Sequence, residues 1–226
     1  MGIRENLERV QLGIRQAAAR SGRDESKVQL LAVTKYANDN DVQELIDAGT
    51  TVFGENRVQN AIKRVECFPE ASWHLIGRLQ TNKVRYCEHF ALIHSLDRWS
   101  LAQALNARAN KWGKVQDVLI QVNVSGEDSK TGLTSEDAKD FAKRVLLDCP
   151  NLRIRGLMTM APLVVAEATR PFFRETKALH DQLQQELGVA WDTLSMGMTN
   201  DFEVAVEEGA TLVRIGSALF AKGDLT

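Results

Sequence analysis

Short apolar runs alternate with amphipathic stretches along the chain, and this alternation predicts strands separated by helices. In the first amphipathic stretch, apolar residues recur at steps of three and four, which places them on one helical face: Ile3, Leu7, Val10, Ile14 and Ala17. Gly22 is expected to end this helix. The apolar run at residues 28–34 is too short for an ordinary helix and predicts a buried strand, with a helix following over residues 39–48.

The same alternation continues to the end of the chain. Seven further apolar runs are predicted to be strands, at residues 51–53, 73–76, 91–96, 115–124, 154–158, 193–195 and 212–215. Helical patterns between them are clearest at residues 99–112, 135–147, 170–187 and 200–208. Asn200 and Glu203 have the spacing of a capping box, so Asn200 is expected to open the last of these helices.

Strands that alternate with helices imply parallel pairing, and eight such units can close into a barrel. We therefore predict an α/β fold, a single TIM-type (β/α)8 barrel with an extra N-terminal helix, in which residues 1–226 form one domain. An open, doubly wound sheet is the alternative. No G-x-G-x-x-G turn follows the first strand, which disfavours the dinucleotide-binding form of that alternative.

Composition and charge exclude several classes of function. Hydrophobic residues make up 44% of the chain and charged residues 26%, which is typical of a folded protein. The net charge is −2 and basic residues do not cluster in a run, so no nucleic-acid partner is expected. No apolar stretch approaches the roughly 18 residues of a membrane span, and no signal-peptide core is present. Cys67, Cys87 and Cys149 lack C-x-x-C spacing, which predicts reduced thiols and a cytoplasmic location.

In a (β/α)8 barrel, functional groups lie where strands end and the following loops begin. The predicted ends of the seventh and eighth strands are rich in glycine and hydroxyl side chains: Ser195, Gly197, Thr199, Gly216 and Ser217. Each group precedes a helix, and helix N-termini bind phosphate through unpaired backbone N–H groups. These residues predict a phosphate site, with ordinary helix caps and turn glycines as the alternative.

A lysine and an arginine are candidates for chemistry at the same end of the barrel. Lys35 directly follows the first strand, where loss of hydration would free its amine as a nucleophile; a solvated rim lysine is the alternative. An amine that forms Schiff bases, combined with a phosphate site, is what pyridoxal phosphate requires. Arg214 alternates with Val213 and Ile215 and is expected to point into the barrel. There it would pair with a carboxylate or with a pyridine ring nitrogen.

Five segments of the chain together resemble the YggS-type pyridoxal phosphate homeostasis proteins. They are Val33–Lys35, Gly54–Asn56, Trp73–Gln80, Ser195–Met198 and Val213–Gly216. The segments follow the family order, and the resemblance extends from the first helix to Phe220. It implies a (β/α)8 barrel like the N-terminal domain of alanine racemase, carrying pyridoxal 5′-phosphate, the cofactor form of vitamin B6.

The resemblance also implies roles for individual residues. Lys35 is similar to the lysine that holds the cofactor as an aldimine, and Arg214 to the partner of the ring nitrogen. Asn56 and Met158 resemble residues beside the ring. The phosphate cradle would consist of Ser195, Gly197, Thr199, Gly216 and Ser217. Tyr36 and Thr199 depart from the family pattern, in which a smaller residue and a serine are frequent.

An arginine at the ring nitrogen favours a carrier over an enzyme. A guanidinium stays charged and disfavours protonation of that nitrogen, so the ring becomes a poor electron sink. Fold relatives that racemise amino acids use a second base, a tyrosine from an additional β-domain of a partner subunit. This chain has only two tyrosines, Tyr36 and Tyr86, and is not expected to hold a second domain.

We therefore expect a protein without turnover that stores, buffers or delivers pyridoxal 5′-phosphate and so affects amino-acid and keto-acid metabolism indirectly. Apo-enzymes that use the cofactor are the expected recipients, and a monomer is expected. A small pyridoxal-phosphate enzyme, such as a weak amino-acid racemase, is one alternative. A barrel isomerase for a phosphorylated metabolite is another.

Some other polar residues receive no functional role. The four histidines, His74, His89, His94 and His180, lack the spacing of metal ligands, so no metal ion is expected. His74 and Arg78 lie within a segment of family resemblance, without an assigned function. Lys130 is either a second amine at the barrel mouth or a solvated loop lysine.

Overall fold

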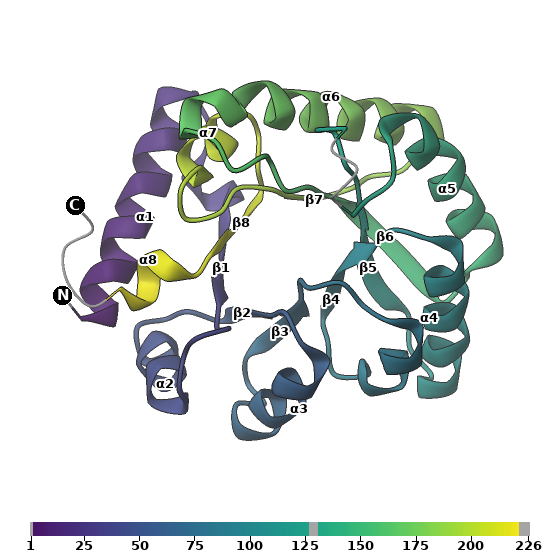
Figure 1. Ribbon diagram of the computed structural model, residues 1–226, viewed down its shortest axis with the longest axis horizontal. Coiled ribbons are helices and arrows are strands. Elements are labelled where there is room, and N and C mark those ends of the chain that lie inside the picture. The colour runs from purple at the N-terminus through teal and green to yellow at the C-terminus, as the bar shows by residue number, and fades with distance from the viewer. Residues whose placement is uncertain (1, 127–130, 222–226) are drawn as a thin grey trace.

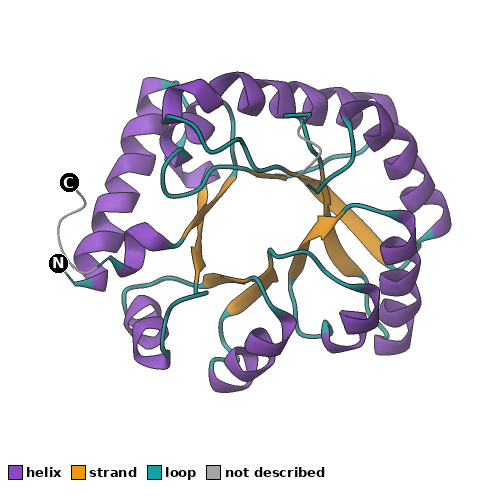
Figure 2. Cartoon of the chain, in the orientation of Figure 1, coloured by secondary structure: helices purple, strands orange, loops and turns teal. Residues whose placement is uncertain are grey.

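The eight predicted strands form a closed, parallel barrel surrounded by helices (Figures 1 and 2). The computed structural model describes residues 2–126 and 131–221. Strand β1 pairs with β2 on one side and with β8 on the other, which closes the sheet. The predicted barrel is thereby confirmed, and the open-sheet alternative is wrong. Among the described residues, no helix is long and apolar enough to cross a membrane.

The strands agree closely with the apolar runs of the sequence. Their bounds are β1 Gln29–Val33, β2 Val52–Glu55, β3 Ser72–Leu75, β4 Leu92–Leu96, β5 Gln116–Gln121, β6 Leu152–Met158, β7 Thr193–Ser195 and β8 Leu212–Ile215. Most strand residues are buried, by the helices outside and by side chains inside the barrel, which is why apolar residues dominate these runs.

The α-helices are α1 Ile3–Arg20, α2 Asp39–Asp47, α3 Val58–Cys67, α4 Trp99–Trp112, α5 Ser135–Asp148, α6 Arg170–Leu187, α7 Phe202–Glu207 and α8 Ser217–Phe220. Three 3₁₀ segments are η1 Glu25–Lys27, η2 Thr81–Tyr86 and η3 Ala166–Thr169. The prediction that Asn200 opens α7 is wrong, because Asp201 is its N-cap. The Asp201 carboxylate instead accepts a hydrogen bond from the Met198 N–H at 2.6 Å.

The extra N-terminal helix joins the two ends of the described chain. In Figure 1, α1 lies beside α8, and the buried Asn6 side chain donates hydrogen bonds to the carbonyls of Leu219 and Ala221 at 3.0 and 3.1 Å. Gly13 allows α1 to approach α7, because a Cβ at this position would lie 2.9 Å from the Phe202 ring. Helix α1 therefore covers the seam where β8 meets β1.

Two contacts fix the loops that follow the first three strands. The Thr34 hydroxyl donates to the buried Glu55 carboxylate at 2.5 Å, which ties the end of β1 to the end of β2. A Cβ on Gly77 would lie 2.1 Å from the Asn56 carbonyl oxygen, so only glycine permits these two loops to come so close. Lys35, Asn56 and Arg78, which are adjacent to these residues in sequence, are thus held on neighbouring loops.

Polar side chains form a hydrogen-bonded chain inside the barrel, along the interior faces of β3, β4, β7 and β8. His74 Nδ1 lies 3.1 Å from His94 Nε2, and His94 Nδ1 lies 3.1 Å from Ser195 Oγ. The Arg214 guanidinium donates to Ser195 Oγ at 2.7 Å and to the Thr159 carbonyl at 2.8 Å. Since all five residues are buried, this chain replaces hydration inside the barrel.

Both interior histidines are neutral in the folded protein. Burial lowers the pKa of His74 to about 4. Burial lowers the pKa of His94 well below its ordinary value, and the nearby Arg214 guanidinium and the neighbouring His74 ring, were it protonated, act in the same direction. The barrel can therefore hold one guanidinium beneath its mouth, because the two rings that connect to it through Ser195 add no further charge.

The depressed histidine pKa values predict a pH dependence of stability. Below pH 6.5 the unfolded chain binds a proton that the folded His74 does not bind until about pH 4. The free energy of unfolding should therefore fall as the pH falls through this window, by up to about 1.4 kcal/mol per pH unit for each such histidine. Urea unfolding at pH 7 and pH 5 measures this difference.

The variant His74→Gln should reduce the loss of stability between pH 7 and pH 5. His89→Gln is the matched control, because His89 is exposed and its removal should leave the loss unchanged. If the free energy of unfolding of His74→Gln depends on pH as that of the wild type does, the pKa of His74 is not lowered in the folded protein.

Candidate functional site

A pocket of about 550 Å³ opens at the carboxyl ends of the barrel strands. Its volume lies within the range of small-molecule sites. Six of the nine residues predicted to bind the cofactor line this pocket: Lys35, Asn56, Thr199, Arg214, Gly216 and Ser217. They come from the ends of β1, β2, β7 and β8, so the barrel closure brings together residues that are far apart in sequence.

Lys35 lies at the exposed edge of this pocket. Its ammonium nitrogen is 4.8 Å from the centre of the Tyr36 ring, and both side chains are exposed. The expected loss of hydration around Lys35 is therefore wrong for the protein alone. A hydrogen bond with Lys35 and its positive charge lower the pKa of the Tyr36 hydroxyl.

Arg214 lies at the bottom of the pocket, with only 4% of its surface exposed. The prediction that it points into the barrel is confirmed, since Val213 and Ile215 pack in the core between the sheet and the helices. Burial lowers the pKa of Arg214 to about 10, and the charge of Asp201 opposes that shift. Two of its five N–H groups bond to Ser195 and Thr159, which leaves donors for a ligand.

Asp201 is the carboxylate whose charge acts on Arg214, so it is the candidate for a salt-bridge partner of the guanidinium. It lines the pocket, is 8% exposed, and burial raises its pKa. Its carboxylate bonds to the Met198 N–H, and no ion pair joins it to Arg214 within the described chain. The alternative of a simple salt bridge at Arg214 therefore does not account for the arrangement.

Hydroxyl and glycine residues that follow β7 and β8 also line the pocket. Thr199 Oγ1 accepts a weak hydrogen bond from the Ala218 N–H at 3.4 Å, which holds the loop after β7 against the start of α8. Ser217 is exposed at the first position of α8. A Cβ on Gly216 would lie 3.4 Å from the Cβ of Val33, another lining residue, so its absence leaves room in the pocket.

The other three predicted residues lie below or behind the pocket. Ser195 is fully buried and is bonded to Arg214 and His94. Gly197 faces α7, because a Cβ there would lie 2.5 Å from the Cβ of Ala205, and its φ of +89° favours glycine. Met158 packs with Leu92 and Leu119 inside the barrel. Ser195, Gly197 and Met158 are not among the residues that line the pocket, so their direct contact with a cofactor stays a prediction.

One wall of the pocket is apolar and was not predicted from the sequence. The loop after β6 contributes Met160, Ala161, Pro162, Leu163 and Val164, and Leu163 is 93% exposed. Gln121 closes the floor nearby and donates to the carbonyl and hydroxyl oxygens of Thr131. The apolar stretch Met160–Ala166, which directly follows the end of β6, was the available signal.

Three further predictions from the sequence concern Lys130, a metal site and Arg78. Lys130 lies outside the described residues. Among the residues that are described, no group of three or more histidine, cysteine, aspartate or glutamate side chains is placed to hold a metal ion. Arg78 lines this pocket and a second, neighbouring cavity.

The pocket thus combines an accessible amine, a buried guanidinium, hydroxyl and amide donors and an apolar wall. An amine can form a carbon–nitrogen bond with an aldehyde. The guanidinium can donate to a ring acceptor, and the hydroxyl and glycine side can accept a phosphate group. The residues present fit a flat, phosphorylated aldehyde.

Similar proteins agree with this arrangement. The family model described as alanine racemase, N-terminal domain, matches residues 6–222. A protein of Aquifex aeolicus named pyridoxal phosphate homeostasis protein is 47% identical and aligns with 98% of this chain and 99% of its own length. Relatives of this kind are named as homeostasis proteins and not as enzymes.

Solved structures with the same fold include two close matches. A protein of Bifidobacterium adolescentis has a TM-score of 0.91 and 32% identity, with 96% of this chain and 94% of that chain covered. PipY of Synechococcus elongatus, solved with pyridoxal phosphate bound, has a TM-score of 0.82 and 36% identity, with 97% and 100% covered. The fold, the match over residues 6–222 and these identities together show that the chain belongs to the alanine racemase N-terminal domain family.

Proposed function

We propose that this protein binds pyridoxal 5′-phosphate as a Schiff base of Lys35 and buffers or delivers the cofactor. The observation that carries the proposal is the joint position of Lys35 and Arg214 in one pocket, the first at its edge and the second at its bottom. The PipY structure with pyridoxal phosphate bound and the names of the curated relatives support the choice of cofactor.

The role proposed for each residue follows from its position. Lys35 supplies the amine, and its exposure lets the cofactor reach it from solvent. Arg214 holds a proton-donating group toward the ring nitrogen, while Ser195 and Thr159 fix the guanidinium from below. Thr199, Gly216 and Ser217 receive the phosphate, and Asn56 lies beside the ring. Gly197 and Met158 are proposed to shape the surroundings.

Two features favour exchange of the cofactor over catalysis. Arg214 disfavours protonation of the ring nitrogen, which withholds the electron sink that transamination needs. Tyr36 adjoins Lys35 on the same strand end, and Tyr86 does not line the pocket. Racemisation with two bases requires them on opposite faces of the substrate, so neither tyrosine complements Lys35 in this way. Apo-enzymes that use the cofactor are the proposed recipients.

Replacement of Lys35 should abolish covalent attachment of the cofactor. The wild-type protein incubated with pyridoxal phosphate should be yellow and, after borohydride reduction, carry one adduct on the peptide that contains Lys35. Lys35→Arg keeps the charge but cannot form a Schiff base, so colour and adduct should both be lost. Lys63→Arg, at an exposed position outside the pocket, is the control. An adduct retained at wild-type yield in Lys35→Arg would locate the attachment elsewhere.

Replacement of Arg214 should change the protonation of the bound ring. Arg214→Gln removes the charge at the bottom of the pocket, so the absorption band of the bound cofactor should shift and become dependent on pH. Loss of hydrogen bonds to Ser195 and Thr159 should also lower the stability by about 1–3 kcal/mol. Arg214→Lys retains the charge and should stay nearer to the wild-type spectrum. A spectrum identical in all three proteins would place Arg214 away from the ring.

No amino acid should be turned over repeatedly. The loaded protein, mixed with an excess of L- or D-alanine and other amino acids, should form at most one equivalent of product, because Tyr36, the tyrosine that lines the pocket, directly follows Lys35 and is not expected to reach the opposite face of a bound amino acid. Chiral chromatography after several hours provides the measurement. Steady-state turnover that disappears in Tyr36→Phe would establish an enzyme with Tyr36 as the second base.

A further inference from the structure

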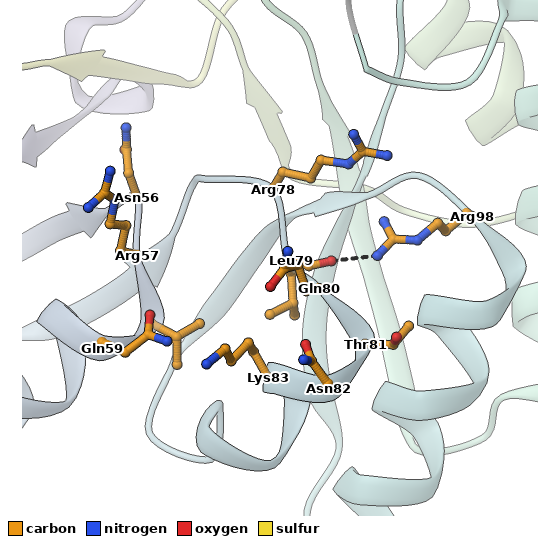
Figure 3. Close-up of a pocket in the computed structure, with 11 residues that line it drawn as sticks. Asn56, Arg57, Gln59, Arg78, Leu79, Gln80, Thr81, Asn82, Lys83 and Arg98 are labelled. Carbon is orange, nitrogen blue, oxygen red and sulfur yellow. Dashed lines mark hydrogen bonds between the residues drawn. The ribbon is translucent and has the colours of Figure 1, made fainter.

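A second cavity of about 690 Å³ lies beside the candidate cofactor pocket, on the same end of the barrel. It is formed by the loops after β2 and β3 and by the start of α4 (Figure 3). Asn56 and Arg78 line both cavities. The close approach of the Gly77 and Asn56 backbones brings the two contributing loops together.

The wall of this second cavity is basic. Four cationic side chains line it, and no carboxylate does: Arg57, Arg78, Lys83 and Arg98. In Figure 3, Arg57 and Gln59 lie on one side of the cavity, Arg98 and Thr81 lie on the other, and Lys83 extends between them. Gln59, Gln80 and Asn82 add amide groups that can donate hydrogen bonds.

Of these four cations, Arg98 alone forms an ion pair with a carboxylate among the described residues. Arg98 pairs with Asp97 at 2.5 Å and donates to the Leu79 carbonyl at 2.6 Å, so it has a structural role in holding the loop after β3. Within residues 2–126 and 131–221, no carboxylate lies within 4 Å of the cationic groups of Arg57, Arg78 or Lys83. Like charges in one cavity repel each other unless an anion joins them.

The surrounding sequence increases this positive potential. Residues 56–114 contain ten of the 28 basic residues and four of the 30 acidic residues, a net charge of +6. The remainder of the chain therefore has a net charge of −8. Arg57, Arg78 and Lys83 lie within the positive segment, which forms the sector of the barrel from α3 to α4 (Figure 1). An anion would be attracted to this sector over a distance of about one Debye length.

We propose that this cavity binds a phosphate group, either free or as the monoester of a small molecule. A phosphate monoester carries a charge of about −1.5 to −2 at neutral pH and has three terminal acceptor oxygens. It therefore compensates more of the three unpaired positive charges than a single carboxylate does, and the planar guanidinium groups suit its oxygens. The site is distinct from Lys35 and does not depend on the function proposed for the first pocket.

The test is a titration of the full-length protein with inorganic phosphate at constant ionic strength, followed by calorimetry and by ¹H–¹⁵N spectra. The amide signals of residues 77–83 should shift saturably. The double variant Arg57→Gln/Lys83→Gln should bind phosphate at least about tenfold more weakly, because it loses two charge-assisted contacts. Its circular dichroism and melting temperature show whether the fold is retained, and Arg57→Lys/Lys83→Arg should restore most of the binding.

The matched control is Lys63→Gln/Lys111→Gln, which removes two exposed charges from the same segment but from outside this cavity. This control should bind phosphate as the wild type does. Equal weakening in both double variants, or no saturable shift at residues 77–83, would overturn the proposal in favour of a diffuse electrostatic effect. An arm with phenyl phosphate distinguishes the two sources: tighter binding than that of inorganic phosphate assigns a monoester, and equal binding assigns free phosphate.

Discussion

The burial of one guanidinium inside a closed barrel is the constraint on which the pocket depends. Arg214 is surrounded by strands on every side and needs acceptors that do not bring further charge. Ser195 and the Thr159 carbonyl provide them, and His94 and His74 extend the same hydrogen-bonded chain across the barrel as neutral rings. These contacts fix the guanidinium where it lines the pocket, and its remaining N–H groups are left as donors for a ligand.

The sequence predicted the architecture because the strands of a parallel barrel are covered on both faces. Short, mainly apolar runs, which became strands of three to seven residues, are separated by stretches with helical periodicity and leave little choice other than alternating strands and helices. Helices α4 and α6 matched their predicted bounds, since buried residues recur there at steps of three and four. The start of α7 did not, because the Asp201 side chain turned back to the Met198 N–H, a local hydrogen bond that competes with the cap expected at Asn200.

The candidate site was predictable only in part, for a related reason. Strand ends identify residues that reach the mouth, which correctly grouped Lys35, Asn56 and Arg214 in one pocket. The position of a strand end in the sequence does not reveal how far below the barrel mouth a side chain lies. Ser195 was grouped with the phosphate residues, yet its strand position places it one layer lower, under Arg214. The loop after β6 was missed because an apolar loop has no chemical signature until the structure shows which cavity it covers.

The two cavities also differ in how deeply their charged groups are buried. The first has its charge at the bottom, as a buried guanidinium held in a fixed orientation, and its amine at the edge, where exchange with solvent is easiest. That order suits a ligand that is bound firmly by its ring and released through its aldehyde end. The second carries exposed or half-exposed cations on short loops, which attract an anion without fixing its orientation. Asn56 and Arg78 border both cavities, and the close approach of the Gly77 and Asn56 backbones holds together the two loops that carry them.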